Sequence, residues 1–175
     1  MFWMGTCLGI WWLGISEFQS GNTPLLYRFM LEELVPVIES EYRTRPDQRL
    51  LLGHSASGLF TLYVLFHQPE AFLGYVVDSP PLSYAKDFMF RIEADYATRH
   101  SALSARLFTG IGSQEELLEP ELDAMMSVSA SNQFSARLSS RNYTRFHYEY
   151  QVFAGFDHLK VPAAIFAAGL KSVLS

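Results

Sequence analysis

The pattern of apolar and polar positions predicts alternating strands and helices. Short apolar or alternating runs predict four strands, at residues 49–52, 73–77, 105–111 and 145–153. Helical spacing of apolar residues predicts helices at 25–41 (kinked at Pro36), 57–68, a polar stretch ending near 99, 115–139 and 161–174. Strands that alternate with helices are typical of an α/β fold, and the continuously apolar runs favour buried strands of a mostly parallel sheet.

Residues 1–18 differ from the rest of the chain. They contain all three tryptophans, and no lysine or arginine precedes Arg28. A secretory signal normally carries such a charge before its apolar stretch, and a membrane-spanning helix needs about 20 apolar residues. Gly5, Gly9 and Gly14 interrupt this slightly shorter segment. We therefore expect a buried strand-and-turn segment, with a membrane anchor or a truncated start as alternatives. The compartment stays open, with a cytoplasmic location favoured.

Composition narrows the possible functions. The chain of 175 residues is long enough for one domain, assigned to residues 1–175 with an atypical apolar segment at 1–20. A net charge of −5 without a basic stripe argues against nucleic-acid binding. The single cysteine, Cys7, excludes an internal disulfide. No cysteine–histidine cluster or phosphate-binding glycine loop indicates a metal or an organic cofactor, so we expect neither.

The segment from residue 50 to residue 60 carries the clearest signal of chemistry. An apolar run leads into Gly-His-Ser-Ala-Ser at 53–57, and a helical stretch follows. This arrangement is typical of a nucleophile elbow, in which a strained turn exposes a serine hydroxyl above the sheet. Ser55 is the predicted nucleophile, and the backbone N–H of Ala56 is the predicted oxyanion donor. Ser57 stands where the Gly-x-Ser-x-Gly pattern has glycine, and an ordinary serine-capped turn is the alternative.

A nucleophilic serine needs a base and an acid that orients it, in the chain order serine, acid, histidine for such a fold. His158 lies between the last predicted strand and the last helix and is the predicted base. The histidines at 54, 67, 100 and 147 fit structural positions better. Glu115, after the third strand, is the predicted acid; Glu116 and Asp78 are the alternatives, and the two glutamates could instead complement a helix macrodipole. Asp157 is expected to shape the loop around the histidine.

These motifs resemble the Putative esterase family of the α/β-hydrolase superfamily, and within it the branch of siderophore (enterobactin-type) esterases. The likeness covers about residues 22–174 and rests on segments 31–39, 53–60, 79–82, 112–115 and 155–158. It implies a three-layer α/β-hydrolase-type sandwich that lacks the first strands. It also implies a triad of Ser55, Glu115 and His158, and ester hydrolysis through an acyl-enzyme.

The chain also departs from the family it resembles, whose members carry a longer segment before the helix at 25–41. That segment forms the first strands and the loop with the second oxyanion donor, and the loss of one such donor costs about 100- to 1000-fold in rate. A bare sheet edge would favour a homodimer. The leading hypothesis is a serine hydrolase of small acyl, aryl or siderophore-type esters. The alternatives are a truncated, weak or inactive hydrolase fold that acts in binding, and a membrane-attached esterase.

Overall fold

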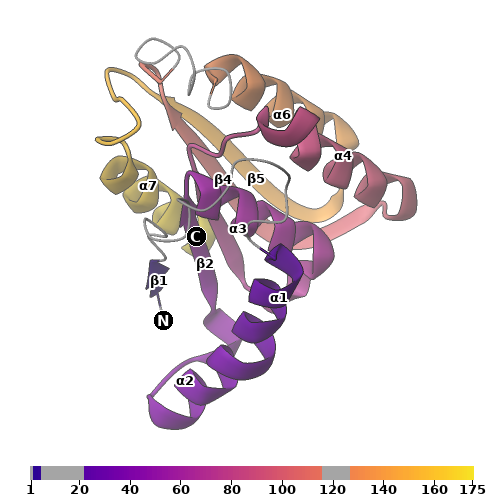
Figure 1. The fold of residues 1–175 in the computed structure, drawn as a ribbon, viewed down its shortest axis with the longest axis vertical. Coiled ribbons are helices and arrows are strands. Elements are labelled where there is room, and N and C mark those ends of the chain that lie inside the picture. Colours follow the sequence, from indigo (N-terminus) through magenta and orange to yellow (C-terminus); the bar gives the residue numbers. More distant parts are fainter. Residues whose placement is uncertain (1, 5–21, 116–126) are drawn as a thin grey trace.

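The computed structural model describes residues 2–4, 22–115 and 127–175, which form a parallel sheet with helices on both faces (Figure 1). The five strands are hydrogen-bonded in chain order, and each pairing is parallel. Their bounds are β1 Phe2–Met4, β2 Leu50–His54, β3 Gly74–Asp78, β4 Ala102–Gly112 and β5 Thr144–Phe153. The four strands predicted from the apolar runs are confirmed, and a short strand lies within the segment 1–18.

The helices follow the strands as the sequence predicts. They are α1 Thr23–Arg28, α2 Val35–Glu41, α3 Ala56–His67, α4 Tyr84–Arg99, α6 Val128–Arg141 and α7 Pro162–Leu174, with short segments η1 Phe29–Leu34, η2 Pro46–Gln48 and η3 Pro69–Ala71. In the described ranges, no helix is both long and apolar enough to cross a bilayer.

The predicted helix at 25–41 is continuous but contains a wide turn before Pro36. In η1 the backbone N–H of Val35 donates to the carbonyl of Met30, five residues earlier, which is the pattern of a π-helix. Pro36 has no N–H to give to the preceding turn. The irregularity predicted at Pro36 is therefore present as a π-helical turn that lies just before the proline.

The predicted helix at 115–139 is wrong at its beginning. Residues 113–115 form a turn, residues 116–126 lie outside the described part of the chain, and α6 begins at Val128. Two backbone hydrogen bonds to a distant segment hold this turn: Ser113 N–H donates to Phe153 O and Gln114 N–H to Phe156 O. The hydroxyl of Ser127 accepts from the N–H of Ala130 at 2.9 Å and caps α6.

The two faces of the sheet bury separate apolar cores. On one face the buried side chains of the strands pack with α3, α4 and α6, and on the other they pack with α7 (Figure 1). The first core includes Leu51, Tyr75, Val77, Leu103 and Leu107, and the second includes Leu50, Leu52, Val76, Phe108 and Ile165. The helix–sheet–helix layering confirms the predicted three-layer α/β architecture.

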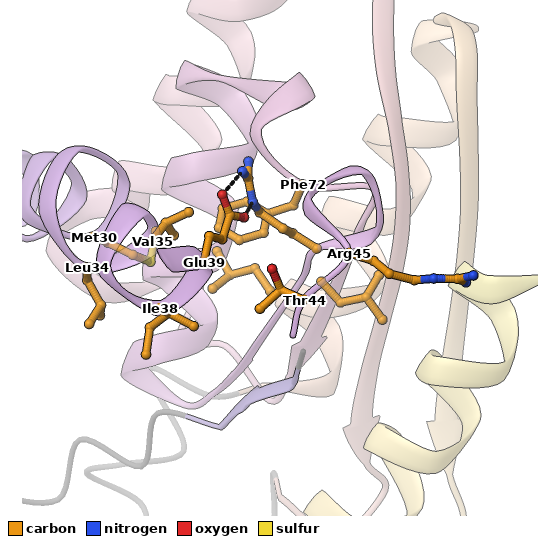
Figure 2. A pocket seen from close by; sticks show the side chains of 11 residues that line it. Met30, Leu34, Val35, Ile38, Glu39, Thr44, Arg45 and Phe72 are labelled. Carbon is orange, nitrogen blue, oxygen red and sulfur yellow. Dashed lines mark hydrogen bonds and ion pairs between the residues drawn. The ribbon is translucent and has the colours of Figure 1, made fainter. Parts of the chain in front are cut away.

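An apolar pocket lies at the amino end of β2, beside η1 and α2 (Figure 2). Its walls include Met30, Leu34, Val35, Ile38 and Phe72. The guanidinium of Arg49 closes one side through two hydrogen bonds to the Glu39 carboxylate, at 2.5 and 2.8 Å. The pocket contains none of the predicted site residues, which follow the carboxyl ends of the strands.

Candidate active site

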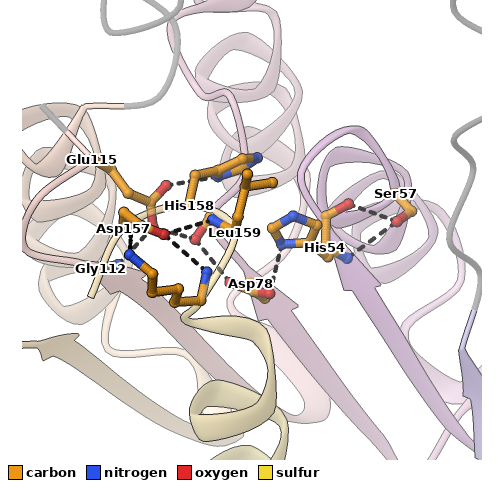
Figure 3. Close-up of polar contacts among 10 residues, drawn as sticks. His54, Ser57, Asp78, Gly112, Glu115, Asp157, His158 and Leu159 are labelled. Atoms are coloured by element: carbon orange, nitrogen blue, oxygen red, sulfur yellow. Dashed lines mark hydrogen bonds and ion pairs between the residues drawn. The ribbon is translucent and has the colours of Figure 1, made fainter. Parts of the chain in front are cut away.

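The predicted site residues meet where the parallel strands end. Ser55 follows β2, Asp78 ends β3, Glu115 lies in the turn after β4, and His158 lies in the loop after β5. Because the carboxyl ends of parallel strands share one edge of the sheet, four segments far apart in the sequence converge there (Figure 3).

Ser55 sits in a strained turn between β2 and α3. Its backbone has φ 56° and ψ −123°, a conformation that residues with a side chain rarely adopt. Its N–H donates to the carbonyl of Asp78 at 2.8 Å. A Cβ atom on Gly53 would lie 2.1 Å from the carbonyl oxygen of Ser57, so only glycine fits there. The chain thus turns as sharply as a nucleophile elbow requires.

Ser57, which replaces a glycine of the sequence pattern, stabilises this turn. Its hydroxyl donates to the carbonyl of His54 at 2.7 Å, and the hydroxyl oxygen accepts from the N–H of His54 at 3.1 Å. The close approach to β3 is made one residue later by Gly58, where a Cβ would lie 3.1 Å from Asp78 O. Ala56 begins α3, so its N–H is one of the first-turn amides that have no acceptor within their own helix.

The buried side chain of Glu115 pairs with the partly exposed side chain of His158. The Nδ1 atom of His158 lies 2.8 Å from Oε2 of Glu115, whose side chain is only 1% exposed. The other carboxylate oxygen accepts from the N–H of Gly112 and from the hydroxyl of Ser79, each at 2.6 Å. With three donors, the carboxylate is held in one orientation, as a buried charged group requires.

Backbone hydrogen bonds hold the turn of Glu115 against the loop of His158. They run from Ser113 N–H to Phe153 O at 2.9 Å and from Gln114 N–H to Phe156 O at 3.0 Å. A Cβ on Gly112 would lie 2.4 Å from Phe156 O, so this glycine permits the approach. Of the alternative acids, Asp78 contacts His54 rather than His158, and Glu116 lies outside the described residues.

Asp157 shapes the histidine loop, as the sequence predicts. Its carboxylate accepts from the N–H groups of Leu159 and Lys160 at 3.1 and 3.0 Å, and from the Lys160 ammonium at 2.6 Å. The hydrogen bond from Lys160 lowers the pKa of Asp157 below its usual value. The charged form of Asp157 therefore stabilises the loop that carries His158.

Two further residues, His54 and Ser79, lie at this edge of the sheet and were not predicted as site residues. Nδ1 of His54 lies 2.6 Å from Oδ2 of Asp78, and its ring centroid lies 4.4 Å from that of His158. The Ser79 hydroxyl lies 2.8 Å from Asp78 Oδ1 and 2.6 Å from Glu115 Oε1. The sequence offers one signal, because the first two apolar runs end just before His54 and Asp78, and the observed register pairs these two residues.

The site thus combines a serine in a strained turn with two histidine–carboxylate pairs, the groups that nucleophilic hydrolysis uses. In the ranges that the structure describes, no group of three or more histidine, cysteine, aspartate or glutamate side chains could hold a metal ion. The histidines at 67, 100 and 147 lie outside the site, at the end of α3, after α4 and within β5.

Comparisons with known proteins support the α/β fold described above and identify the family of the chain. The chain is 36% identical over 73 residues to the ferri-bacillibactin esterase BesA of Bacillus subtilis, a match that covers 42% of this chain and 25% of that protein. It also resembles the BES protein of Bacillus cereus (24% identity, TM-score 0.74, 87% of this chain and 56% of that one). A further similar structure is the siderophore hydrolase EstA of Aspergillus nidulans (20% identity, TM-score 0.76, 87% and 57%).

The match thus spans a quarter of the curated relative and somewhat more than half of these solved chains. The family profile is matched over most of this chain, from residue 16 to residue 170. The chain belongs to the Putative esterase family.

Proposed function

We propose that this chain carries the catalytic residues of a serine hydrolase of the α/β-hydrolase superfamily, which cleaves carboxylic esters through an acyl-enzyme. The observation that carries the proposal is the Glu115–His158 hydrogen bond at the same edge of the sheet as a serine whose turn has the strain of a nucleophile elbow. Membership of the Putative esterase family supports the same reaction class.

In the first step, Ser55 Oγ attacks the ester carbonyl while Nε2 of His158 accepts the hydroxyl proton. Glu115 holds the Nδ1–H of His158, which leaves Nε2 free of a proton, and the negative carboxylate stabilises the imidazolium that forms. The bond from carbon to Ser55 Oγ forms and the bond to the alcohol oxygen breaks. The alcohol leaves with the proton from His158.

In the second step, water attacks the acyl-enzyme while His158 takes a proton from it. The bond to Ser55 breaks, the acid is released, and the proton returns to Ser55. The N–H of Ala56, at the start of α3, is the oxyanion donor in both steps.

We propose small acyl or aryl esters as general substrates, and siderophore-type esters as the more specific class. The second part rests on relatives that bear such names, a ferri-bacillibactin esterase and siderophore hydrolases. Chromatography of ferric bacillibactin after incubation with the protein tests this narrower class separately from ester hydrolysis itself.

Hydrolysis of p-nitrophenyl butyrate tests the proposed reaction. Purified chain should release p-nitrophenolate, and Ser55→Ala should reduce the rate to that of the buffer, because no other group replaces the nucleophile. The matched control is Ser131→Ala, which removes a buried hydroxyl in α6 that has no hydrogen-bond partner and should keep full activity.

Equal, background-level rates in the unmodified chain and Ser55→Ala would overturn the proposal. They would favour the alternative, a hydrolase-like scaffold that binds a ligand or partner without turning it over.

A further inference from the structure

His54 forms a second histidine–carboxylate pair within the site. Its Nδ1 lies 2.6 Å from Oδ2 of Asp78, whose side chain is fully buried. The side chain of His54 is 21% exposed, as is that of His158. A surface histidine in an elbow would not need a buried carboxylate of its own, because burying that charge is costly.

The two pairs meet at Ser79, whose single hydroxyl proton can be donated to one carboxylate or the other. The hydroxyl of Ser79 lies within hydrogen-bond distance of Asp78 Oδ1 and of Glu115 Oε1, at 2.8 and 2.6 Å. The same Asp78 holds the nucleophile turn, because its carbonyl accepts the N–H of Ser55 at 2.8 Å. A shift of Asp78 would therefore move His54, the Ser55 turn and the support of Glu115 together.

The rings of His54 and His158 pack against each other. Their centroids are 4.4 Å apart and their planes are inclined by 33°, and His158 lies between Glu115 and His54 (Figure 3). The hydrogen bond from Nδ1 to Glu115 and the covalent bond to Cβ hold two points of the His158 ring, so the ring can still tilt about the line that joins them. Contact with a second ring fixes its plane as well, which aligns Nε2 for proton transfer.

We propose that His54 is a positioning residue whose ring keeps the His158 ring in the plane required for proton exchange with Ser55. The inference rests on the function proposed above. It assigns no proton transfer to His54 itself, whose role is the contact of its ring face with that of His158.

Kinetics of the full chain with p-nitrophenyl butyrate test this role. His54→Ala removes the ring and should lower kcat by about 10- to 100-fold, with KM changed little because binding does not depend on the plane of His158. His54→Phe also loses the bond to Asp78 but keeps a ring, and should recover most of the lost kcat. The control is His67→Ala, which removes a histidine stacked on Tyr63 outside the site and should leave kcat unchanged.

Equal losses of kcat in His54→Ala and His54→Phe, or no loss in either, would overturn the positioning role. If His54→Ala fails to fold, His54→Gln replaces it, since the glutamine amide can still donate to Asp78 but has no ring, and the same drop in kcat is expected.

A second measurement works without turnover and separates this proposal from the proposed function. Diethyl pyrocarbonate modifies imidazole rings, and mass spectrometry gives the rate at each histidine, with the exposed His147 as internal reference. The rate at His158 should rise in His54→Ala and stay near that of the unmodified chain in His54→Phe. The same rate in all three proteins would overturn the packing role, even if Ser55→Ala had already shown that the chain is an esterase.

Discussion

Buried carboxylates occur in two clusters, and in each cluster a different kind of side chain compensates the cost of burying the charge. The site cluster contains Asp78 and Glu115, whose side chains are 0 and 1% exposed, and each carboxylate binds a histidine. The arginine cluster contains Glu93, also fully buried, between α4, α6 and the start of β5. Glu93 accepts two hydrogen bonds from Arg141, at 2.7 and 2.9 Å, and one from Tyr143 at 3.2 Å, with Arg137 at 3.9 Å.

The difference lies in whether the partner can change its charge. Arginine stays protonated at every pH at which the protein folds, and the hydrogen bond to Glu93 raises the pKa of Arg141 further. Histidine can gain or lose a proton near neutral pH. A carboxylate paired with arginine therefore holds elements together, whereas one paired with histidine can also support a reaction that moves protons.

The largest expected effect is the loss of activity on changing Glu115. Glu115→Gln keeps the size of the side chain but allows its amide to donate to His158, which reverses the positions of proton and lone pair on the ring. We expect kcat for p-nitrophenyl butyrate to fall by about 10⁴-fold, the loss typical of such a change in a triad. Circular dichroism should show a folded protein.

Glu93→Gln is the matched control, because it makes the same change in the arginine cluster. Its kcat per folded molecule should stay close to that of the unmodified chain, while its Tm falls. An equal loss of kcat in both variants would contradict the division of roles between the two clusters.

A smaller effect, on stability alone, is expected for Arg141. Arg141→Met leaves Glu93 buried without its closest partner, which should lower the free energy of unfolding by about 3 kcal/mol, measured by urea titration.

Glu93→Gln should lower the free energy of unfolding by less, because the guanidinium groups of Arg137 and Arg141 are about one-third exposed and can bind water instead. The double variant Glu93→Leu with Arg141→Met should recover much of the loss, since no unpaired charge is then buried.

If the double variant were as unstable as Arg141→Met alone, the cost would come from lost packing rather than from the buried charge. In that case the ion pair between Glu93 and Arg141 would not account for the stability of the arginine cluster.

The smallest effect concerns alkaline pH. Burial, and next the charge of Glu93, raises the pKa of Tyr143 above its usual value near 10. The unfolded chain therefore releases this proton first, so stability is fully present below about pH 10 and falls as the pH rises toward the folded-state pKa. In urea titrations at pH 8 and pH 11, Tyr143→Phe should lose less stability than the unmodified chain, by about 1 kcal/mol.

Burial also raises the pKa of Tyr75. The Tyr143→Phe variant should therefore still lose some of its free energy of unfolding between pH 8 and pH 11. An identical pH dependence in the two proteins would mean that Tyr143 ionises in the folded state as easily as in the unfolded one.

Much of the fold could be predicted from the sequence because local rules decide it. Apolar runs place β2 to β5 within a few residues, and the apolar stripe of residues 161–174 gives α7. The turn at residues 113–115 could not be predicted in this way, because the amides of residues 113–114 bond to the distant loop at 153–156. Nothing in the local pattern records such a tertiary contact.

In the candidate site, too, local patterns could be predicted from the sequence and tertiary contacts could not. The elbow motif indicated Ser55 and the position after the last strand indicated His158, and the structure brings Glu115 to His158 as the sequence predicted. The choice between Glu115 and Asp78 was open, because both follow apolar strands and both reach the same edge of the sheet. The structure gives each carboxylate a different histidine, a pairing set by side-chain reach and by loop contacts rather than by spacing along the chain.

The backbone at position 55 favours glycine over serine on stability alone. A side chain held at φ 56° costs about 1 to 3 kcal/mol, whereas glycine adopts such angles without that penalty. A lineage released from selection for hydrolysis would gain stability by drifting to glycine here, and a lineage under such selection would keep the hydroxyl. Serine at position 55 thus weakens the fold that carries it, and the proposed nucleophile role would account for its presence there.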